Sequence, residues 1–282
     1  MQTGLPFPLR ADQRGVALVA VLWVVAALSI LVTGMVQTQR EEIRNASSAR
    51  MRLHADAVGQ GAIHLAVQLA LTQPQRRERL SRNRIAYDGV DVLVEVQPFS
   101  GLVDINLAPA PLLAALFTIN GGVEPGTSER LAAAVVALRD LRPSEPPPRF
   151  KAPEDLLSVE GISYDLYAKL APLVTTDTRG SGRINPLAAP QEVLLLLAGG
   201  DQGLASQIAA NRDADVAGMD TTRLQAAFTD NSVSGRLRFR AFVPFPDGSR
   251  AVVVRDIDVS PVAEGTAPWR TMRTHATVVS LN

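Results

Sequence analysis

The longest apolar run of the chain lies close to its N-terminus. Residues 16–36 read VALVAVLWVVAALSILVTGMV and contain no charged side chain. As an α-helix rising about 1.5 Å per residue, this run is roughly 31 Å long, enough to cross the hydrocarbon core of a bilayer. Arg10 and Arg14 precede it, and basic residues favour the cytoplasmic side of a membrane. The pattern predicts one membrane-spanning helix, with the rest of the chain exported.

Two other interpretations of this run are a buried core helix and a cleaved secretory signal. Its length, its lack of charge and its position near the N-terminus argue against a core helix. It is also longer than the roughly 7–15 apolar residues of a signal peptide, and no small-x-small cleavage site ends it. The apolar helix is therefore expected to remain in the mature protein.

A helical pattern continues from residue 37 to about residue 72. This stretch is rich in Ala, Arg, Glu and Gln, has no proline before Pro74, and places apolar side chains as on an amphipathic helix. We expect one unbroken helix from the apolar run to about residue 72. The arginines that follow are interpreted as a solvated polar loop rather than a nucleic-acid patch. They are Arg76, Arg77, Arg79, Arg82 and Arg84.

Strand patterns lie on both sides of a helical middle region. Valines alternate with other residues over 90–97, and apolar residues alternate with arginines over 237–243. Further strands are expected at 251–259, after a Pro-Asp-Gly turn, and at 274–279. Strands that flank helices predict an inserted domain, not a tandem one. The expected fold class is α+β: a long N-terminal helix packed on a small antiparallel sheet, with a large all-helical domain inserted between strands.

The middle region contains a weak internal repeat. Each copy has an Ile-Asn pair, a proline, an apolar helix that ends at a Gly-Gly pair, and a second helix with an Arg-Asp pair. The matching positions are Asn106, Pro111, Gly121 and Arg139 in the first copy and Asn185, Pro190, Gly199 and Arg212 in the second. Asn favours turns, Pro suits the first turn of a helix and Gly ends one. Each copy is therefore predicted to form turn–helix–turn–helix; a chance similarity of two Ala/Leu-rich helices is the alternative.

Residues 150–174 lie between the copies and resemble a helix-hairpin-helix. They read FKAPEDLLSVEGISYDLYAKLAPLV. In DNA-repair proteins such hairpins present backbone amides to phosphates. Here Glu160 lies at the tip, and the second helix carries Asp165 and a single cation, Lys169. An acid beside an anion-binding tip is unfavourable, so we predict packing rather than nucleic-acid binding.

Composition argues against several kinds of chemistry. The chain has 28 basic and 28 acidic residues and no cysteine, which disfavours a nucleic-acid role and excludes disulfides and thiolate sites. His54 and His64 are ten residues apart, not the four that place two metal ligands on one helical face, and His275 is the third histidine. No phosphate loop and no nucleophile beside a base is present. We predict a structural protein, not an enzyme, with no catalytic residues.

The N-terminus resembles the leader of type IV prepilins. Basic residues and then Gly15 directly precede the apolar helix, which begins at Val16. The resemblance implies cleavage by prepilin peptidase between Gly15 and Val16, and N-methylation of Val16. Pilins usually have Glu at the fifth mature position, but here that position is Ala20. Because a carboxylate without a partner is costly in a membrane, a subunit with nothing stacked above it has no need of this Glu.

Lack of this Glu is typical of the general secretion pathway protein K family, the large minor pseudopilins of type II secretion. The segments RGVALVAVLWVVAALSIL, SGLVDINLAP, residues 150–174 and INPLAAPQEVLLLLAG resemble that family in the same order. A Trp and an acidic run of the family are replaced here by LRDLRPSEPPPRF. Some members bind calcium, which needs six to eight oxygen ligands. Scattered acids such as Asp213, Asp215 and Asp220 match no ligand set, so no metal-binding residue is assigned.

This resemblance implies a minor pseudopilin of the type II secretion system that caps the tip of the periplasmic pseudopilus and supports its assembly for protein export. Expected partners are the minor pseudopilins I and J, the major pseudopilin, the inner-membrane assembly platform and the prepilin peptidase, without nucleic acid or cofactor. The chain is expected to cross the inner membrane once, with a cytoplasmic N-terminus and a periplasmic bulk. The alternatives are a minor pilin of another type IV filament and an exported helix-hairpin-helix DNA-binding protein.

The organisation implied by the resemblance is pilin-like. A prepilin leader occupies 1–15 and the transmembrane part of the helix 16–36. The helical spine and first strands follow at 37–104, and an inserted helical domain of helix-hairpin-helix or SAM-like repeats at 105–232. Residues 233–282 supply the strands that complete the sheet.

Overall fold

The computed structural model describes the backbone of residues 13–140, 150–176, 179–216, 218–260 and 268–279. The chain divides into two compact units, Met1–His54 and Ala55–Asn282. Helix α1 (Gln13–Thr72) contributes residues to both units. Within this helix, the side chains of residues 18–29 and 46–72 are described. The helix ends at Thr72, as the sequence predicts, because Pro74, two residues later, cannot continue an α-helix.

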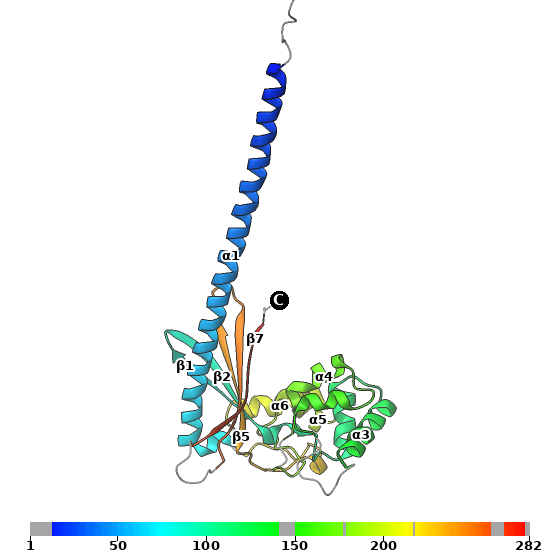
Figure 1. Ribbon diagram of the computed structural model, residues 1–282. Helices are drawn as coiled ribbons and strands as arrows, with labels where there is room; N and C mark the ends of the chain where they lie inside the picture. Colours follow the sequence, from blue (N-terminus) through cyan, green and yellow to red (C-terminus); the bar gives the residue numbers. More distant parts are fainter. Residues whose placement is uncertain (1–12, 141–149, 177–178, 217, 261–267, 280–282) are drawn as a thin grey trace, which may run out of the picture. The chain divides into compact units, whose positions relative to one another are not determined.

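The second unit contains a five-stranded antiparallel sheet in the order β1-β2-β5-β6-β7 (Figure 1). The strands are β1 (Ser81–Tyr87), β2 (Val90–Pro98), β5 (Arg236–Pro244), β6 (Arg250–Asp258) and β7 (Arg270–Val279). The neighbours β2 and β5 pair directly, with Val96 opposite Phe239, although more than a hundred residues separate them in sequence. The intervening chain therefore leaves and re-enters the sheet at one end of two adjacent strands.

One face of this sheet packs against the last turns of α1. Alternate residues of β2, β5 and β6 face the helix because side chains of a strand alternate between its two faces. A Cβ on Gly59 would lie only 2.5 Å from Cγ2 of Val253, so glycine is what allows the helix to approach β6 this closely. The buried residues of this first core include Ala55, Val58, Ala62, Ile63, Ala66, Val94, Val96, Phe239, Ala241 and Val253.

The chain between β2 and β5 is mainly helical and has a core of its own. Its elements are η2 (Phe99–Gly101), β3 (Val103–Asp104), α2 (Ala110–Ala115), η3 (Leu116–Asn120), α3 (Pro125–Asp140), η4 (Pro153–Ser158), α4 (Tyr164–Leu170), η5 (Ala171–Leu173), β4 (Val174–Thr175), α5 (Gln191–Leu197), α6 (Gln202–Asp213) and η6 (Ala226–Phe228). This second core draws on residues from Val103 to Leu224 and shares none with the first. The predicted α+β class, with a helical insertion between strands, is confirmed; β3 and β4 add one short parallel pairing to the insertion.

One local prediction is wrong. The arginine cluster is not one polar loop, because η1 covers Pro74–Arg77 and both Arg82 and Arg84 lie in β1, opposite Glu95 and Leu93 of β2. Cross-strand pairing with Glu95 gives Arg82 a partner that its local sequence does not reveal. The first arm of the hairpin, for which the sequence predicts an apolar helix, is the short 3₁₀ helix η4, in which Leu156 is buried.

Candidate functional site

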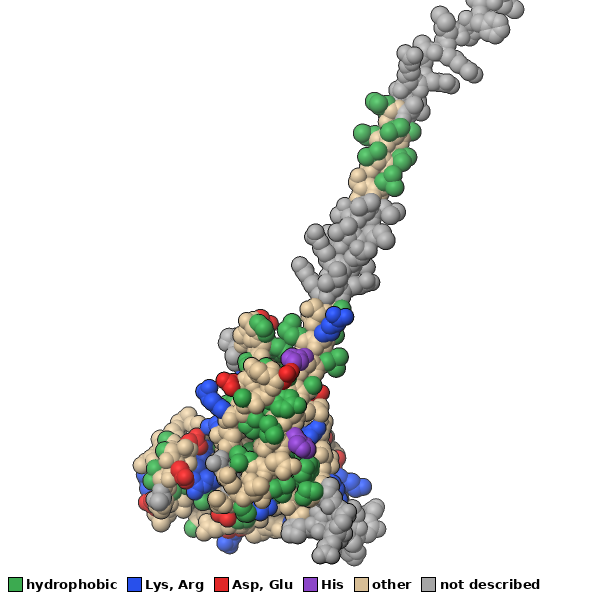
Figure 2. Space-filling model, turned by 90° about the vertical axis from the view of Figure 1, so that its left-hand side faces the viewer, with side chains coloured by type: hydrophobic (Ala, Val, Ile, Leu, Met, Phe, Trp, Pro, Cys, Tyr) green, Lys and Arg blue, Asp and Glu red, His purple; other side chains and the backbone are tan. Residues whose placement is uncertain are grey.

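The described part of the N-terminal apolar run carries exposed hydrophobic side chains. Residues 18–29 are exposed all round the helix, with Leu18 75% and Trp23 73% accessible (Figure 2). A helix of a soluble domain usually buries one apolar stripe, so this uniform exposure marks a surface for other molecules. Where side chains are described, no helix is both long and apolar enough to span a membrane. Residues 16–17 and 30–36 of the predicted span lie outside the described side chains.

The residues assigned to processing lie at the start of this helix. Gly15 and Val16 belong to α1, but their side chains lie outside the described ones, as do residues 1–12 of the expected leader. Ala20 is described and exposed. Cleavage and methylation at Gly15 and Val16 therefore stay predictions.

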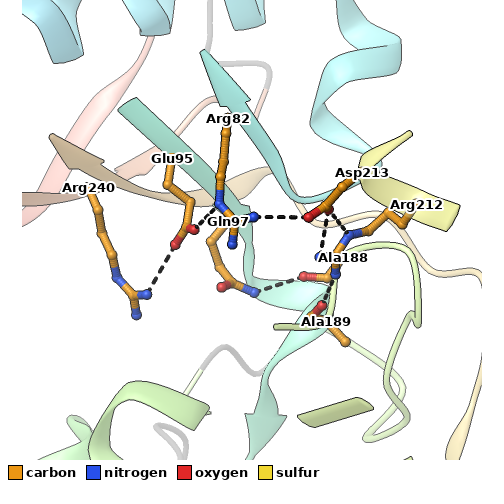
Figure 3. A network of polar contacts seen from close by, with 8 residues as sticks. All are labelled: Arg82, Glu95, Gln97, Ala188, Ala189, Arg212, Asp213 and Arg240. Atoms are coloured by element: carbon orange, nitrogen blue, oxygen red, sulfur yellow. Dashed lines mark hydrogen bonds and ion pairs between the residues drawn. The ribbon is translucent and has the colours of Figure 1, made fainter. Parts of the chain in front are cut away.

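A polar junction joins the sheet to the second repeat of the helical region (Figure 3). Glu95 of β2 accepts hydrogen bonds from Arg82 Nε at 3.0 Å and from Arg240 Nη1 at 3.2 Å. Arg82 also donates from Nη1 to Asp213 at the end of α6, at 2.9 Å. Gln97 donates to the carbonyl of Ala188 at 2.8 Å. The face of the sheet opposite α1 thus receives the helical region through hydrogen bonds and ion pairs.

The carboxylate of Glu95 is the centre of this junction. Its side chain is only 9% exposed, and it forms ion pairs with two arginines at once. Burial lowers the pKa of Arg240, while the charge of Glu95 opposes that change. Removing one partner of a buried pair typically costs about 3–5 kcal/mol because the other charge stays buried without compensation. The junction is therefore sensitive to single substitutions.

A second pair lies on the same face of the sheet. Arg238 of β5 and Asp256 of β6 form a bidentate pair, with Nε–Oδ1 and Nη2–Oδ2 distances of 2.8 and 3.2 Å. Both residues are buried, and the guanidinium carbon lies 5.4 Å from the centre of the Phe99 ring. Fork-shaped geometry and a cation–π contact hold this arginine in one orientation. Phe99 belongs to η2, so this pair also fixes the point where the chain leaves the sheet.

Asp258 of β6 anchors another segment of the helical region. It pairs with Arg179 and accepts a hydrogen bond from the backbone N–H of Ser260 at 3.0 Å. Burial acts to raise the pKa of Asp258, but hydrogen bonds from Ser260 and Arg179 outweigh it and lower the pKa to about 2. The carboxylate therefore stays charged at neutral pH and connects β6 to the segment that precedes the second repeat.

The hairpin also contacts the sheet. Glu154 of η4 pairs with Arg273 of β7. Burial acts to raise the pKa of Glu154, but the hydrogen bond from Arg273 produces a net lowering. Burial, followed by the charge of Glu154, raises the pKa of Tyr167. The hairpin that resembles a DNA-binding motif thus holds its acidic Glu154 against Arg273 of β7 in the same chain.

The Arg-Asp pairs of the repeat have a structural role. Arg139 of α3 donates to the carbonyl of Ala108 at 2.7 Å, and Arg212 of α6 donates to that of Ala189. In each copy the arginine therefore binds the loop that precedes the first helix. The predicted turn–helix–turn–helix pattern is confirmed in both copies, as α2-η3 with α3 and as α5 with α6.

The two asparagines also correspond in their contacts. Asn106 Nδ2 donates to the carbonyl of Phe150 at 2.8 Å, 44 residues later, and Asn185 Nδ2 to that of Ser232 at 2.9 Å, 47 residues later. Each asparagine therefore ties the start of its copy to the chain that leaves it. This shared closure supports a true duplication over a chance similarity of apolar helices.

The hairpin packs inward rather than presenting a cationic tip. Leu166 and Leu170 of α4 are buried in the second core. Ser163 caps this helix by accepting a hydrogen bond from the N–H of Leu166 at 3.2 Å. Glu160 is exposed at the turn. Its negative charge is unfavourable for phosphate contact, as the sequence predicts.

The acidic residues considered for calcium have other partners. Asp213 pairs with Arg82 and Arg212, Asp215 pairs with Arg79, and Asp220 accepts a hydrogen bond from the N–H of Thr222 at 2.9 Å. In the portion of the chain that is described, no group of three or more His, Asp or Glu side chains is placed to hold a metal ion.

The histidines belong to two different elements of the fold, α1 and β7. His64 stacks edge-on against Trp269, with ring centres 5.2 Å apart, and His275 lies in β7. His54 belongs to the first unit.

Sequence reasoning missed the junction on the second face of the sheet. The signal was present: Arg238 and Arg240 alternate with apolar residues in β5, and Asp256 and Asp258 do so in β6. Alternation of this kind normally indicates a face open to water. Only the fold shows that the helical region covers this face and buries its charges.

No protein-family model matches the chain, and no curated protein matches it. Among solved structures, a chain from the GspK–GspI–GspJ complex of the enterotoxigenic Escherichia coli type 2 secretion system is similar in structure. The similarity covers 84% of this chain and 99% of that chain, with 14% sequence identity and a TM-score of 0.48.

Proposed function

We propose that this chain is a minor pseudopilin of a type II secretion system, of the general secretion pathway protein K type. The observation that carries the proposal is its combination of parts. An exposed apolar run begins a helix whose last turns pack on an antiparallel sheet, and a helical region with its own core is inserted between two paired strands of that sheet. This combination of parts suits assembly with other subunits.

In this proposal the apolar helix crosses the inner membrane and packs against the helices of other subunits. The helical region and sheet lie in the periplasm. Ala20 and the bulk of the helical region support a position at the tip of the pseudopilus, because neither favours another subunit above it. Its partners are the minor pseudopilins I and J, the major pseudopilin and the inner-membrane assembly platform.

Mass spectrometry of the mature N-terminus tests the assignment. We expect a chain that starts at a methylated Val16. Gly15→Val should keep residues 1–15, whereas Gly4→Val, a matched change in the same leader, should leave processing intact. A mature start near residue 37 or beyond indicates cleavage by an ordinary signal peptidase and contradicts the proposal.

Co-purification tests the position at the tip. The full chain should form a stable complex with minor pseudopilins I and J from the same organism. Ala20→Glu should weaken that complex because it places an unpaired carboxylate in the membrane, whereas Ala20→Leu should not. A chain that remains a solitary monomer with both partners present would contradict capping, and duplex DNA binding at physiological salt would favour the hairpin alternative.

A further inference from the structure

Strand β7 (Arg270–Val279) forms one edge of the sheet (Figure 1). Among the described residues, no strand pairs with its outer side. Natural proteins usually shorten, charge, bulge or cover such edges, because unpaired N–H and C=O groups invite another strand. In β7 such protective features lie only in the first half of the strand, which contains Arg270 and Arg273 and pairs with β6 across the bulge at Asp256/Ile257. The second half is regularly paired to β6, contains no proline and carries no Lys, Arg, Asp or Glu.

The side chains of β7 are also exposed on both faces of the strand, although Arg273 pairs with Glu154 of the hairpin. Residues 270–277 are all exposed, whereas the adjacent β6 is largely buried. The described side chains of β7 belong to neither hydrophobic core. The opposite edge strand β1 differs, because it has only seven residues and its Arg82 is held by Glu95 and Asp213. Strand β7 is thus the edge that the fold leaves available.

A hollow of about 320 Å³ adjoins β7 on the face of the sheet away from α1. Arg273 and His275 line it from β7, Arg238 and Arg240 from β5, and Glu154 from the hairpin. A guanidinium has five N–H donors. Arg240 directs one of them to Glu95, and Arg273 directs one to Glu154. In the described part of the chain, Arg240 and Arg273 therefore have further donors that suit a carboxylate from outside.

We propose that β7 accepts an extended strand of a partner protein at its free edge, over Thr274–Val279. An acidic side chain of that strand enters the hollow beside Arg273. Side chains of a strand repeat every second residue, so a partner with acids at alternate positions presents all of them on this side. A second copy of β7 is a poor occupant, because its residues 274–279 contain no acidic side chain that could enter the hollow.

This inference rests on the sheet alone and does not depend on the proposed secretion role. Strand addition uses main-chain hydrogen bonds for affinity and side-chain contacts on alternate positions for specificity. The class of partner is therefore a protein with an extended, acidic segment. A mature N-terminus other than Val16 would contradict the proposed secretion role but would leave strand addition at β7 unaffected.

Synthetic peptides test the charge requirement. The full chain in detergent is titrated into a fluorescein-labelled ten-residue peptide of alternating Glu and Thr, and binding is followed by fluorescence anisotropy. The matched control has Lys in place of Glu. We expect saturable binding of the Glu peptide, at least tenfold tighter than that of the Lys peptide. Equal affinity for both, or no saturable binding of the Glu peptide at millimolar concentration, would overturn the proposal.

Adjacent prolines test the edge itself. Ala276 and Thr277 lie opposite Val253 and Val252 of β6. In an antiparallel edge strand, successive N–H groups point alternately to the neighbour and away from it. Of Ala276→Pro and Thr277→Pro, one should therefore lower the melting temperature, and the other should keep it but lose at least tenfold in peptide affinity.

An exposed charge removal provides a second variant that does not depend on the proline result. Arg270 is 73% exposed and 3.8 Å from Asp258, so Arg270→Gln removes a positive charge without placing a carboxylate beside Asp258 and should fold normally. It should weaken the binding of the Glu peptide and strengthen that of the Lys peptide. If the proline variant with an unchanged melting temperature binds as the parent does, or if Arg270→Gln leaves both affinities unchanged, the proposal is wrong.

Discussion

The buried pair of Arg238 and Asp256 allows a quantitative test of how the second face of the sheet is held. Asp256→Asn keeps the shape of the side chain but removes its charge, so the guanidinium stays buried with a neutral partner. Breaking a buried pair costs about 3–5 kcal/mol. Asn still accepts one of the two hydrogen bonds, at 2.8 or 3.2 Å, so we expect the lower end, about 3 kcal/mol.

Fluorescence of Trp269 provides the assay. This residue packs against the first core, and Trp23→Phe removes the other tryptophan of the chain. In urea, with a slope of about 1–3 kcal/mol per molar, a loss of about 3 kcal/mol moves the unfolding midpoint by about 1–3 M. The control is Asp215→Asn, whose carboxylate is 81% exposed beside Arg79. An exposed pair is worth at most about 1 kcal/mol.

A double variant separates loss of the pair from loss of one charge. Arg238→Met with Asp256→Leu replaces both ions by apolar side chains, and such replacements are often neutral or stabilising. We expect the double variant to be more stable than Asp256→Asn. If Asp256→Asn shifts the midpoint no more than the Asp215→Asn control, or if the double variant is the least stable, the reasoning fails.

Three further predictions concern acid stability, helix packing and the repeat. The pKa of Asp258 is lowered from 3.8 to about 2, so the stabilisation of about 2 kcal/mol that its charge provides is present above pH 4 and is lost as the pH falls through 2. The urea midpoints of the parent and of Asp258→Asn should therefore differ at pH 7 and converge at pH 2. An undiminished difference at pH 2 would contradict this prediction. Gly59→Ala should lower the melting temperature and cost about 1–3 kcal/mol of stability, because the new Cβ would lie 2.5 Å from the buried side chain of Val253. In the control Gly61→Ala, the nearest atoms belong to the movable, 40% exposed ring of Tyr87, so the loss of stability should be smaller. Arg212→Met should lower the free energy of urea unfolding by about 1–3 kcal/mol, because it leaves the carbonyl of Ala189 without its donor. A change near zero would show that Arg212 does not stabilise the repeat.

Local patterns were sufficient for most elements of the fold. The helix end near residue 72 follows from Pro74, and alternation at 90–97 and 237–243 identifies β2 and β5. These signals depend on near neighbours in the chain, which is why they survive in the tertiary structure. The arrangement of strands around a helical middle region likewise indicated an insertion.

Local patterns failed where a partner lies far away in sequence. Arg82 looked like part of a polar loop because its partners, Glu95 and Asp213, are 13 and 131 residues away. Arg238 and Arg240 looked like a solvated face because nothing near them in sequence covers them. For the candidate site, residues Gly15, Val16 and Ala20 came from the sequence alone, whereas the junction came from the structure alone.

The sequence by itself determined the apolar N-terminal helix, the strands, the repeated helical units and the absence of cysteine chemistry. Each of these depends on side-chain type and spacing within one segment. Only the tertiary structure decided which face of the sheet is covered, which charges are buried and which edge stays open. Burial and charge pairing depend on segments that meet in space, so the same alternating arginines are solvated on an open sheet and become the anchor of a covered one.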